Sequence, residues 1–332
     1  MLRTMLMMLC IGILVLTGCQ HTPTSDQVIA KTFNHATQIQ QKLLDRHAPA
    51  GVLIHSNVMY LSEPKLTLDL YQPEYIAELG ARPTVVWIHG GGWVSGSKEH
   101  ARGYFKLLAA QGFNVVSVEY QFAPEVQYPE QLLQINQALK FIDEHAETYH
   151  IDANQLYLAG DSAGANLASH YAALLTNQDF ARQSAFVPTI QMQQLKGLIL
   201  HCGIYDMASF VLTAPDEHKI IEWGIYSLVQ AYIGERKNDA AFLTEISPSQ
   251  HLTHNFPPVL ISGGNKDFLT ESQSIPFVQA LKQHNVPVTA VFYPESTEPL
   301  IHEYQFFMRL NASQATFAQT LQFIHFYSGL RL

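Results

Sequence analysis

Residues 156–164 read LYLAGDSAG, and this stretch decides the fold that we expect. An apolar run ends at Ala159 and is followed directly by Gly160-Asp161-Ser162-Ala163-Gly164. Gly-x-Ser-x-Gly between a strand and a helix is typical of a serine nucleophile held on a strained turn, whereas the simpler interpretation is a tight turn without chemistry. Because a helical pattern follows the motif, we expect Ser162 at the carboxyl end of a strand. The free N–H groups of the next helix would then lie beside it and favour negative charge.

A second glycine-rich stretch, His89-Gly90-Gly91-Gly92-Trp93, follows the apolar run TVVWIH. Consecutive glycines let the backbone approach a ligand closely and direct N–H groups at it. The alternatives are a flexible loop or a phosphate-binding loop, but the latter would continue with Gly-Lys-Ser/Thr. We therefore expect the N–H groups of Gly90 and Gly91, together with that of Ala163, to stabilise a developing oxyanion. His89 is expected to be structural.

Strand and helix patterns alternate along the rest of the chain. Apolar or alternating segments predict strands, and apolar residues at helical spacing predict helices. The predicted strands are 66–71, 84–89, 114–119, 155–159, 195–202, 258–262 and 289–293, and the predicted helices are 31–48, 106–111, 131–149, 165–176, 275–284 and 315–327. This alternation favours an α/β fold with a mostly parallel central sheet and helices on both faces. Residues 205–250 interrupt it with a longer helical stretch, which predicts an insertion on top of the sheet.

Three motifs together resemble those of the hormone-sensitive-lipase-like esterases. HGGGW matches the family's HGGG motif, GDSAG matches its serine turn, and EYQFAPEVQYPEQ, residues 119–131, is similar to its YRLAPE segment. The resemblance covers most of residues 65–327. It implies an α/β-hydrolase fold with a small helical cap formed by residues of about 31–60 and 205–250. The chain departs from the family at Ala165, where a further glycine is usual, and at Asp267-Phe268-Leu269, where Asp-Pro-Leu is usual.

The resemblance also implies a catalytic triad in which the acid and the histidine follow the serine in that order. Asp267 falls at the family's acid position, after the predicted strand, and is expected to orient the imidazole. Glu271 and Asp206 are weaker candidates, and Asp267 would otherwise cap a helix. His302, beyond the last predicted strand, is expected to take the proton of Ser162.

Most of the 16 histidines must have other roles. His254 and His284 are less well placed than His302, because one precedes the strand of the acid and the other ends a helix. No group of residues has zinc-binding spacing such as His-Glu-x-x-His, so neither a metal nor another cofactor is expected.

The resemblance implies a serine carboxylesterase that hydrolyses short- to medium-chain carboxylic esters through an acyl-enzyme, with a small-molecule ester as its partner. Two alternatives stay open: an arylformamidase or other amidase-type hydrolase, and a non-catalytic binding protein on a hydrolase fold. With 19 Lys and Arg against 28 Asp and Glu, the formal net charge is −9. This composition does not suggest a nucleic-acid-binding protein, which would need clustered basic residues. The sequence leaves the oligomeric state open.

The N-terminal stretch MLRTMLMMLCIGILVLTGC has one positive charge near its start and an apolar run too short to span a bilayer comfortably. Its end, Leu16-Thr17-Gly18-Cys19, resembles a bacterial lipobox. This implies that residues 1–18 are a lipoprotein signal peptide and that Cys19 carries the lipid. Residues 19–30 would then be a tether to a hydrolase domain of residues 31–332. An ordinary secretory signal and an uncleaved anchor are the alternatives.

The residues around the lipobox bear on localisation. An aspartate after the lipidated cysteine often retains lipoproteins in the inner membrane, and Gln20 stands there instead. We therefore expect a lipid-anchored protein of the bacterial cell envelope, at the outer membrane and facing the periplasm. Cys10 would leave with the signal, so Cys202 would remain as a lone thiol and the mature domain would hold no internal disulfide.

Overall fold

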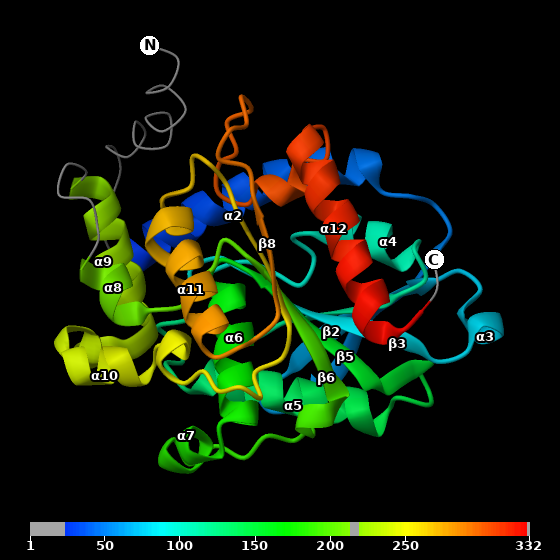
Figure 1. The fold of residues 1–332 in the computed structure, drawn as a ribbon, viewed down its shortest axis with the longest axis horizontal. Coiled ribbons are helices and arrows are strands. Elements are labelled where there is room, and N and C mark those ends of the chain that lie inside the picture. The colour runs from blue at the N-terminus through cyan, green and yellow to red at the C-terminus, as the bar shows by residue number, and fades with distance from the viewer. Residues whose placement is uncertain (1–23, 213–218, 331–332) are drawn as a thin grey trace, which may run out of the picture.

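An eight-stranded sheet forms the centre of the computed structural model, which describes residues 24–212 and 219–330 (Figure 1). The strands are β1 (Val52–Leu61), β2 (Leu66–Pro73), β3 (Arg82–Ile88), β4 (Asn114–Val118), β5 (Ile151–Asp161), β6 (Leu195–His201), β7 (Val259–Gly263) and β8 (Val288–Phe292). Their order is β1-β2-β4-β3-β5-β6-β7-β8. The strands from β4 to β8 are parallel, and β2 is antiparallel to both β1 and β4. The carboxyl ends of β3, β5, β6 and β7 therefore meet at one edge, where ligands bind in open α/β sheets.

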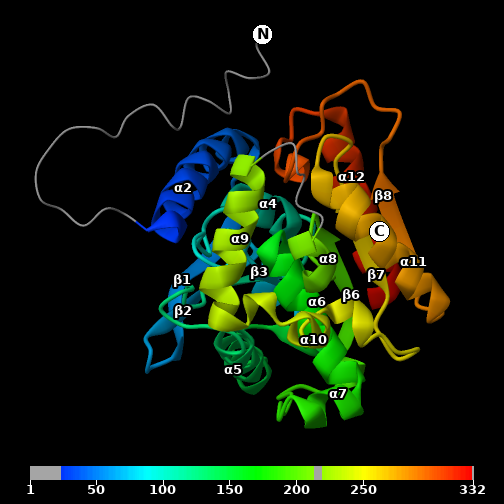
Figure 2. The same ribbon diagram turned by 90° about the vertical axis from the view of Figure 1, so that its left-hand side faces the viewer.

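Helices cover both faces of this sheet (Figures 1 and 2). The α-helices are α2 (Ser25–Leu44), α3 (Ile76–Leu79), α4 (Arg102–Ala109), α5 (Glu130–Glu144), α6 (Ala163–Thr176), α7 (Gln178–Gln183), α8 (Met207–Leu212), α9 (Lys219–Ile233), α10 (Ala240–Glu245), α11 (Ile275–Gln283) and α12 (Asn311–Ser328). The short helices are η1 (Asp45–His47), η2 (Met192–Gln194), η3 (Gly234–Asn238), η4 (Pro248–Gln250), η5 (Thr270–Ser274) and η6 (Tyr304–Phe306). Side chains of α4 and α12 join the core on one face, and those of α5, α6 and α11 join it on the other. The predicted α/β fold class is confirmed.

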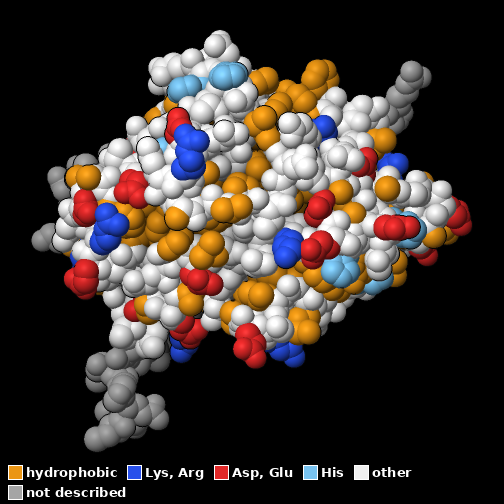
Figure 3. All heavy atoms as spheres, turned by 90° about the horizontal axis from the view of Figure 1, so that it is seen from below, with side chains coloured by type: hydrophobic (Ala, Val, Ile, Leu, Met, Phe, Trp, Pro, Cys, Tyr) orange, Lys and Arg blue, Asp and Glu red, His pale blue; other side chains and the backbone are white. Residues whose placement is uncertain are grey.

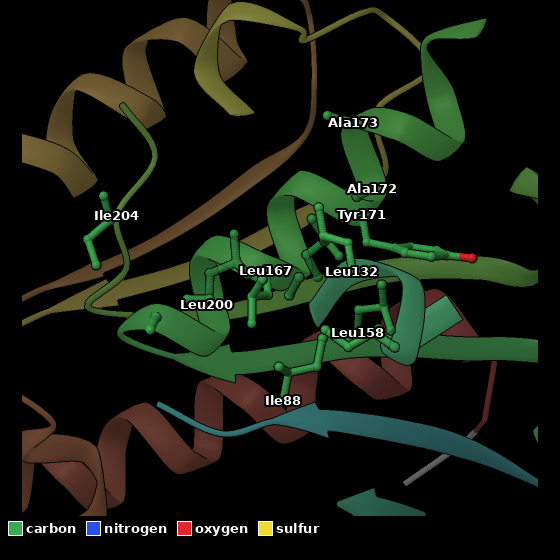
Figure 4. Close-up of a cluster of buried hydrophobic side chains, with 14 of the residues drawn as sticks. Ile88, Leu132, Leu158, Leu167, Tyr171, Ala172, Ala173, Leu200 and Ile204 are labelled. Carbon is green, nitrogen blue, oxygen red and sulfur yellow. The ribbon is translucent and has the colours of Figure 1, made fainter. Parts of the chain in front are cut away.

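The two cores follow from the alternation of side chains along buried strands. In β3, Val86 and Ile88 face one core, whereas Val85 and Trp87 face the other, and all four are fully buried. Figure 4 shows the first core, where Ile88, Leu158 and Leu200 of three neighbouring strands meet Leu132 of α5 and Leu167 of α6. Burial on both faces explains why these strands are almost continuously apolar in the sequence.

The N-terminal helix begins earlier than the sequence pattern suggests. Helix α2 starts at Ser25, so residues 25–30 of the predicted tether are helical. The N–H of Thr24 donates to Gln27 Oε1 at 3.2 Å, as in a capping box. Because the first residues of α2 are polar, they resemble a linker in composition. The predicted signal peptide, Cys19 and the first part of the tether lie outside the described residues.

The predicted cap is partly wrong. Residues 52–60 were expected to belong to it, but they form most of β1, the antiparallel edge strand of the main sheet. Tyr60 is its one buried side chain, so β1 lacks the regular apolar alternation that reveals a half-buried strand. The other predicted cap segment, residues 205–250, contains α8, α9 and α10 within the described residues. Helix α9 contacts α2, as both ribbon views show.

Figure 3 shows one face of the surface, where acidic and basic side chains are scattered among hydrophobic ones. Within residues 24–212 and 219–330, no helix is both long enough and apolar enough to cross a membrane.

Candidate active site

Ser162 lies on the sharp turn that joins β5 to α6. Its backbone has φ 52° and ψ −120°, a conformation that residues other than glycine rarely adopt. The two flanking glycines make this turn possible. A Cβ on Gly160 would lie 2.5 Å from the carbonyl carbon of Gly164, and a Cβ on Gly164 would lie 2.0 Å from the carbonyl oxygen of Ile88 in β3. The sequence therefore uses glycine where three backbone segments meet, and the strained residue is the predicted nucleophile.

The predicted acid and base form a hydrogen-bonded pair. His302 Nδ1 donates to Asp267 Oδ2 at 2.8 Å, although the two residues are far apart in the sequence. Asp267 follows β7, and its other carboxylate oxygen accepts the N–H of Leu269 at 3.0 Å. The Asp267 side chain is fully buried, whereas that of His302 is 39 % exposed. This arrangement fixes the imidazole tautomer and leaves Nε2 free to act as a base.

Strand β6 lies between β5, which ends before Ser162, and β7, which ends before Asp267. The N–H of Ser162 donates to the carbonyl of His201 at 2.9 Å, and the next residue, Cys202, lies beside the imidazole of His302. Donor atoms of Cys202, Asp267 and His302 all lie within 4.8 Å of one another. The three residues of the predicted triad thus come from the carboxyl ends of β5 and β7 and from the loop after β8.

The charge state of the base depends on its surroundings. Burial lowers the pKa of His302, but the side chains of Cys202 and Asp267 raise it more, so the pKa lies above the ordinary value for histidine. Burial raises the pKa of the Cys202 thiol to about 11, which keeps this thiol protonated at neutral pH. A negative Asp267 therefore stabilises the imidazolium that forms when His302 accepts a proton.

The weaker candidates lie elsewhere or have other roles. Asp206 Oδ1 accepts the N–H of Ser209 at 2.8 Å, so this carboxylate caps the start of α8. Glu271, His254 and His284 are exposed on the surface.

The prediction for Gly90 as an oxyanion donor is wrong. Its N–H already donates to Asp161 Oδ2 at 2.8 Å, so this group is not available to a substrate. Gly91 and Gly92 follow with φ +110° and +62°, and within the described residues neither N–H has an acceptor. The N–H of Ala163, in the first turn of α6, has no intrahelical acceptor either. Among the described residues of the loop 89–93 and of the first turn of α6, Gly91, Gly92 and Ala163 therefore offer free N–H donors.

Asp161 holds the loop of residues 89–93, which we call the oxyanion loop. Its carboxylate is fully buried and accepts three hydrogen bonds: from Trp87 Nε1 at 2.8 Å, from His100 Nε2 at 3.1 Å and from Gly90. Burial alone would raise the pKa of Asp161, but His100 and the Trp87 N–H lower it below its usual range. His100 has a correspondingly raised pKa, because Asp161 outweighs the effect of its burial. A buried ion pair therefore anchors this loop.

His89 is structural, as predicted from the sequence. Burial lowers its pKa to about 4, so the ring is neutral, and it stacks on Tyr120 with ring centroids 4.4 Å apart. Its Nδ1 donates to the carbonyl of Gly90 at 2.8 Å, and the Tyr120 hydroxyl donates to the carbonyl of His89 at 2.9 Å.

Side chains of helices α2 and α9 contact the oxyanion loop. A Cβ on Gly92 would lie 2.7 Å from Leu228 of α9 and 3.2 Å from Phe33 of α2. The next residue, Trp93, stacks on Tyr232 of α9 with ring centroids 4.5 Å apart and planes 6° apart. Side chains of α2 and α9 therefore contact the backbone and the Trp93 ring of the oxyanion loop.

Helix α2 also contacts the segment after the base. Gln40 Nε2 donates to Glu303 Oε2 at 3.4 Å. Burial, with Asp161 nearby, raises the pKa of Glu303 to about 7. The carboxyl group of Glu303, the residue after His302, therefore changes its charge near neutral pH.

Sequence reasoning missed four residues of this site: Asp161, His100, Cys202 and Gly92. Only Asp161 left a usable signal, because a carboxylate next to the serine, at the end of a buried strand, needs a partner nearby. His100 and Cys202 lie in segments whose neighbours depend on strand order. In the described residues, Cys202, Asp267 and His302 are the one group of three whose donor atoms could surround a metal ion.

Comparisons with known proteins agree with this architecture. The model of the BD-FAE family matches residues 68–281. Esterase LipC of Mycobacterium tuberculosis is 27% identical over 228 residues, which are 68% of this chain and 54% of that protein. This chain therefore aligns with about half the length of that relative.

Two solved structures are similar over almost their whole length. Esterase B from Lactobacillus rhamnosis, inhibited by a tributyrin phosphonate, has a TM-score of 0.76 and 22% identity, with 91% of this chain and 94% of that chain covered. The hyperthermophilic esterase from Pyrobaculum calidifontis has a TM-score of 0.73 and 24% identity, with 97% and 96% covered. These likenesses establish the fold. The matching family model is BD-FAE, whereas the motifs resembled hormone-sensitive-lipase-like esterases. Since the BD-FAE model covers well over half of the sequence, the chain belongs to the BD-FAE family and has the α/β-hydrolase fold.

Proposed function

We propose that this protein is a serine carboxylesterase. The observation that carries the proposal is the combination of a strained Ser162 with a hydrogen-bonded Asp267–His302 pair at the same edge of the sheet. A serine hydroxyl is a weak nucleophile without an adjacent base, and an oriented imidazole is the usual one. The relatives named as esterases support the same activity.

The mechanism follows from the roles of these groups. His302 Nε2 takes the proton of Ser162 while Oγ attacks the ester carbonyl. The N–H groups of Gly91, Gly92 and Ala163 receive the developing oxyanion, and each such donor contributes about 2.7–4 kcal/mol to lowering the barrier. His302 then gives the proton to the leaving alcohol, and water releases the acid from the acyl-enzyme by the same steps.

We further propose short- to medium-chain esters as substrates. The inhibitor of esterase B is built on tributyrin, and side chains of Leu228 and Phe33 offer apolar surface beside the oxyanion loop. Formamides and other amides need the same nucleophile and are therefore compared directly in the test. A binding protein without catalysis would not need the strained serine or the ordered acid–base pair.

The test is hydrolysis of p-nitrophenyl acetate, butyrate and octanoate by the chain from residue 20, beside an aryl formamide. This chain retains every described element. We expect ester hydrolysis, with a loss of at least about 10³-fold in Ser162→Ala. Ser169→Ala is the matched control, because its hydroxyl only donates to carbonyls within α6. Equal rates in the parent and Ser162→Ala would refute the mechanism, and faster formamide turnover would identify an amidase-type enzyme.

We also propose that the protein is a lipoprotein of the cell envelope, anchored through Cys19 at the outer membrane and facing the periplasm. The support is the lipobox-like sequence that ends the apolar N-terminal stretch. Mass spectrometry of the protein from a membrane fraction should find an acylated N-terminus at Cys19, and Cys19→Ala should abolish it. An unmodified N-terminus, or one retaining residues 1–18, would contradict this proposal.

A further inference from the structure

Cys202 makes and breaks no bond in the proposed reaction, yet it lies against the acid–base pair. It follows β6 with φ 44°, its N–H donates to the carbonyl of Ser262 at 2.9 Å, and its side chain is buried. Its Sγ, a carboxylate oxygen of Asp267 and a ring nitrogen of His302 all lie within 4.8 Å of one another. We call these three residues the Cys202 cluster.

The donor set of the Cys202 cluster matches a borderline-soft divalent metal. Thiolate, imidazole and carboxylate are the three ligand types that Zn²⁺ binds in proteins, at about 2.0–2.3 Å. Tetrahedral ligands at these lengths lie roughly 3.3–3.8 Å apart, so donor atoms that lie within 4.8 Å of one another need to approach by about 1.5 Å at most. A thiolate and a carboxylate also balance the charge of Zn²⁺, which leaves no net charge in this buried place.

We propose that the Cys202 cluster binds Zn²⁺ and that the bound ion inhibits the enzyme. On binding, the Cys202 thiol releases its proton to solvent, an imidazolium at His302 does the same, and the thiolate coordinates the metal. His302 contributes the lone pair of one ring nitrogen, and its single proton stays on the other. Neither nitrogen can then accept the proton of Ser162, so attack on an ester stops. The half-exposed His302 side chain gives the ion a path from solvent.

The binding part of this proposal is independent of the proposed function, whereas the inhibition part rests on it. The experiment therefore measures both. Zn²⁺ binding to the metal-free chain from residue 20 is followed by calorimetry, and Co²⁺ is used as a spectroscopic probe. This chain contains one cysteine, Cys202, so a sulfur-to-cobalt charge-transfer band reports on that thiol alone. Ester hydrolysis is then titrated with Zn²⁺ and restored with a chelator.

We expect one Zn²⁺ per chain, a charge-transfer band with Co²⁺, and inhibition that a chelator reverses. Loss of a residue that only supports a metal ligand weakens binding about 10–100-fold, so Cys202→Ser should weaken it at least tenfold and raise the inhibitory concentration likewise. Each variant is compared with its own uninhibited rate. His254→Ala and His284→Ala remove exposed histidines and serve as matched controls, with no expected change.

Three results would overturn the proposal: no charge-transfer band in the parent protein, no Zn²⁺ bound, or equal Zn²⁺ affinity in Cys202→Ser. If Cys202→Ser does not fold, the Co²⁺ spectrum of the parent still decides. An esterase that binds Zn²⁺ at Cys202 without loss of rate would refute the inhibition. A protein that binds Zn²⁺ but hydrolyses no ester would refute the proposed function and leave the site standing.

Discussion

The buried carboxylate of Asp161 offers the sharpest test of how the oxyanion loop is held. Asp161→Asn keeps the shape of the side chain and removes its charge. The carboxylate accepts from Trp87, His100 and Gly90, whereas an amide has one acceptor oxygen. If that oxygen keeps the first two donors, the amide NH₂ faces the N–H of Gly90, and two donors oppose each other.

The size of the effect follows from these contacts. A buried donor left without an acceptor costs about 1–3 kcal/mol, and removing one partner of a buried ion pair costs about 3–5 kcal/mol. Because the two costs overlap, we expect the free energy of unfolding to fall by about 3–5 kcal/mol. The loop also loses its anchor next to Gly91, and a misplacement of about 1 Å can lower a rate by about 100-fold.

The pKa shifts of Asp161 and His100 determine the pH at which Asp161→Asn loses the most stability. Asp161 has a lowered pKa, so its contribution to stability is present above the unfolded value of about 4 and is lost as pH falls. His100 has a raised pKa, so its contribution is present below about 6.5 and is lost as pH rises through the folded pKa. The difference between parent and variant should therefore peak between about pH 4 and 6.5.

The assay is urea unfolding followed by tryptophan fluorescence, together with kcat for p-nitrophenyl butyrate. Asp179→Asn is the matched control, because Asp179 forms an exposed pair with Arg182 and such pairs contribute little. The reasoning fails if Asp161→Asn unfolds within about 1 kcal/mol of the parent and keeps its kcat.

Three further predictions concern the base, the serine turn and the cap. Because the pKa of His302 is raised, kcat/KM should fall as the pH is lowered, with a midpoint above the ordinary pKa of histidine. Asp267→Asn should lower both this midpoint and kcat/KM. An unchanged pH profile in the variant would contradict this. Gly164→Ala should prevent folding or lower the free energy of unfolding by several kcal/mol, since its Cβ would lie 2.0 Å from a carbonyl oxygen of β3. Gly224→Ala in α9 is the control, because its Cβ would have no neighbour within 4 Å. It should raise the free energy of unfolding by up to about 1 kcal/mol, as measured by thermal unfolding. Tyr232→Ala should lower the free energy of unfolding by about 3–5 kcal/mol, because the stack on Trp93 of the oxyanion loop is lost. Tyr232→Phe should be nearly neutral, because the buried hydroxyl has no partner among the described residues. Similar unfolding curves for the two variants would argue against the stack.

Sequence alone determined the features that depend on residues close together in the chain. The order of strands and helices came from local periodicity, and the serine turn came from the apolar run before Gly160 and the helical pattern after Gly164. The pairing of Asp267 with His302 came from the family resemblance, and the structure brings these two side chains within hydrogen-bond distance.

The tertiary structure decided the features that depend on strand order. β1 was missed because an exposed edge strand has little apolar alternation, although its pairing with β2 defines it. The Gly90 N–H was assigned to the substrate because nothing local shows that β5 lies beside β3, which brings Asp161 under the oxyanion loop. Cys202 meets His302 because parallel β6 and β7 end at one edge. A hydrogen bond or a metal-ligand cluster needs atoms within a few ångströms, and only the packing of distant segments sets those distances.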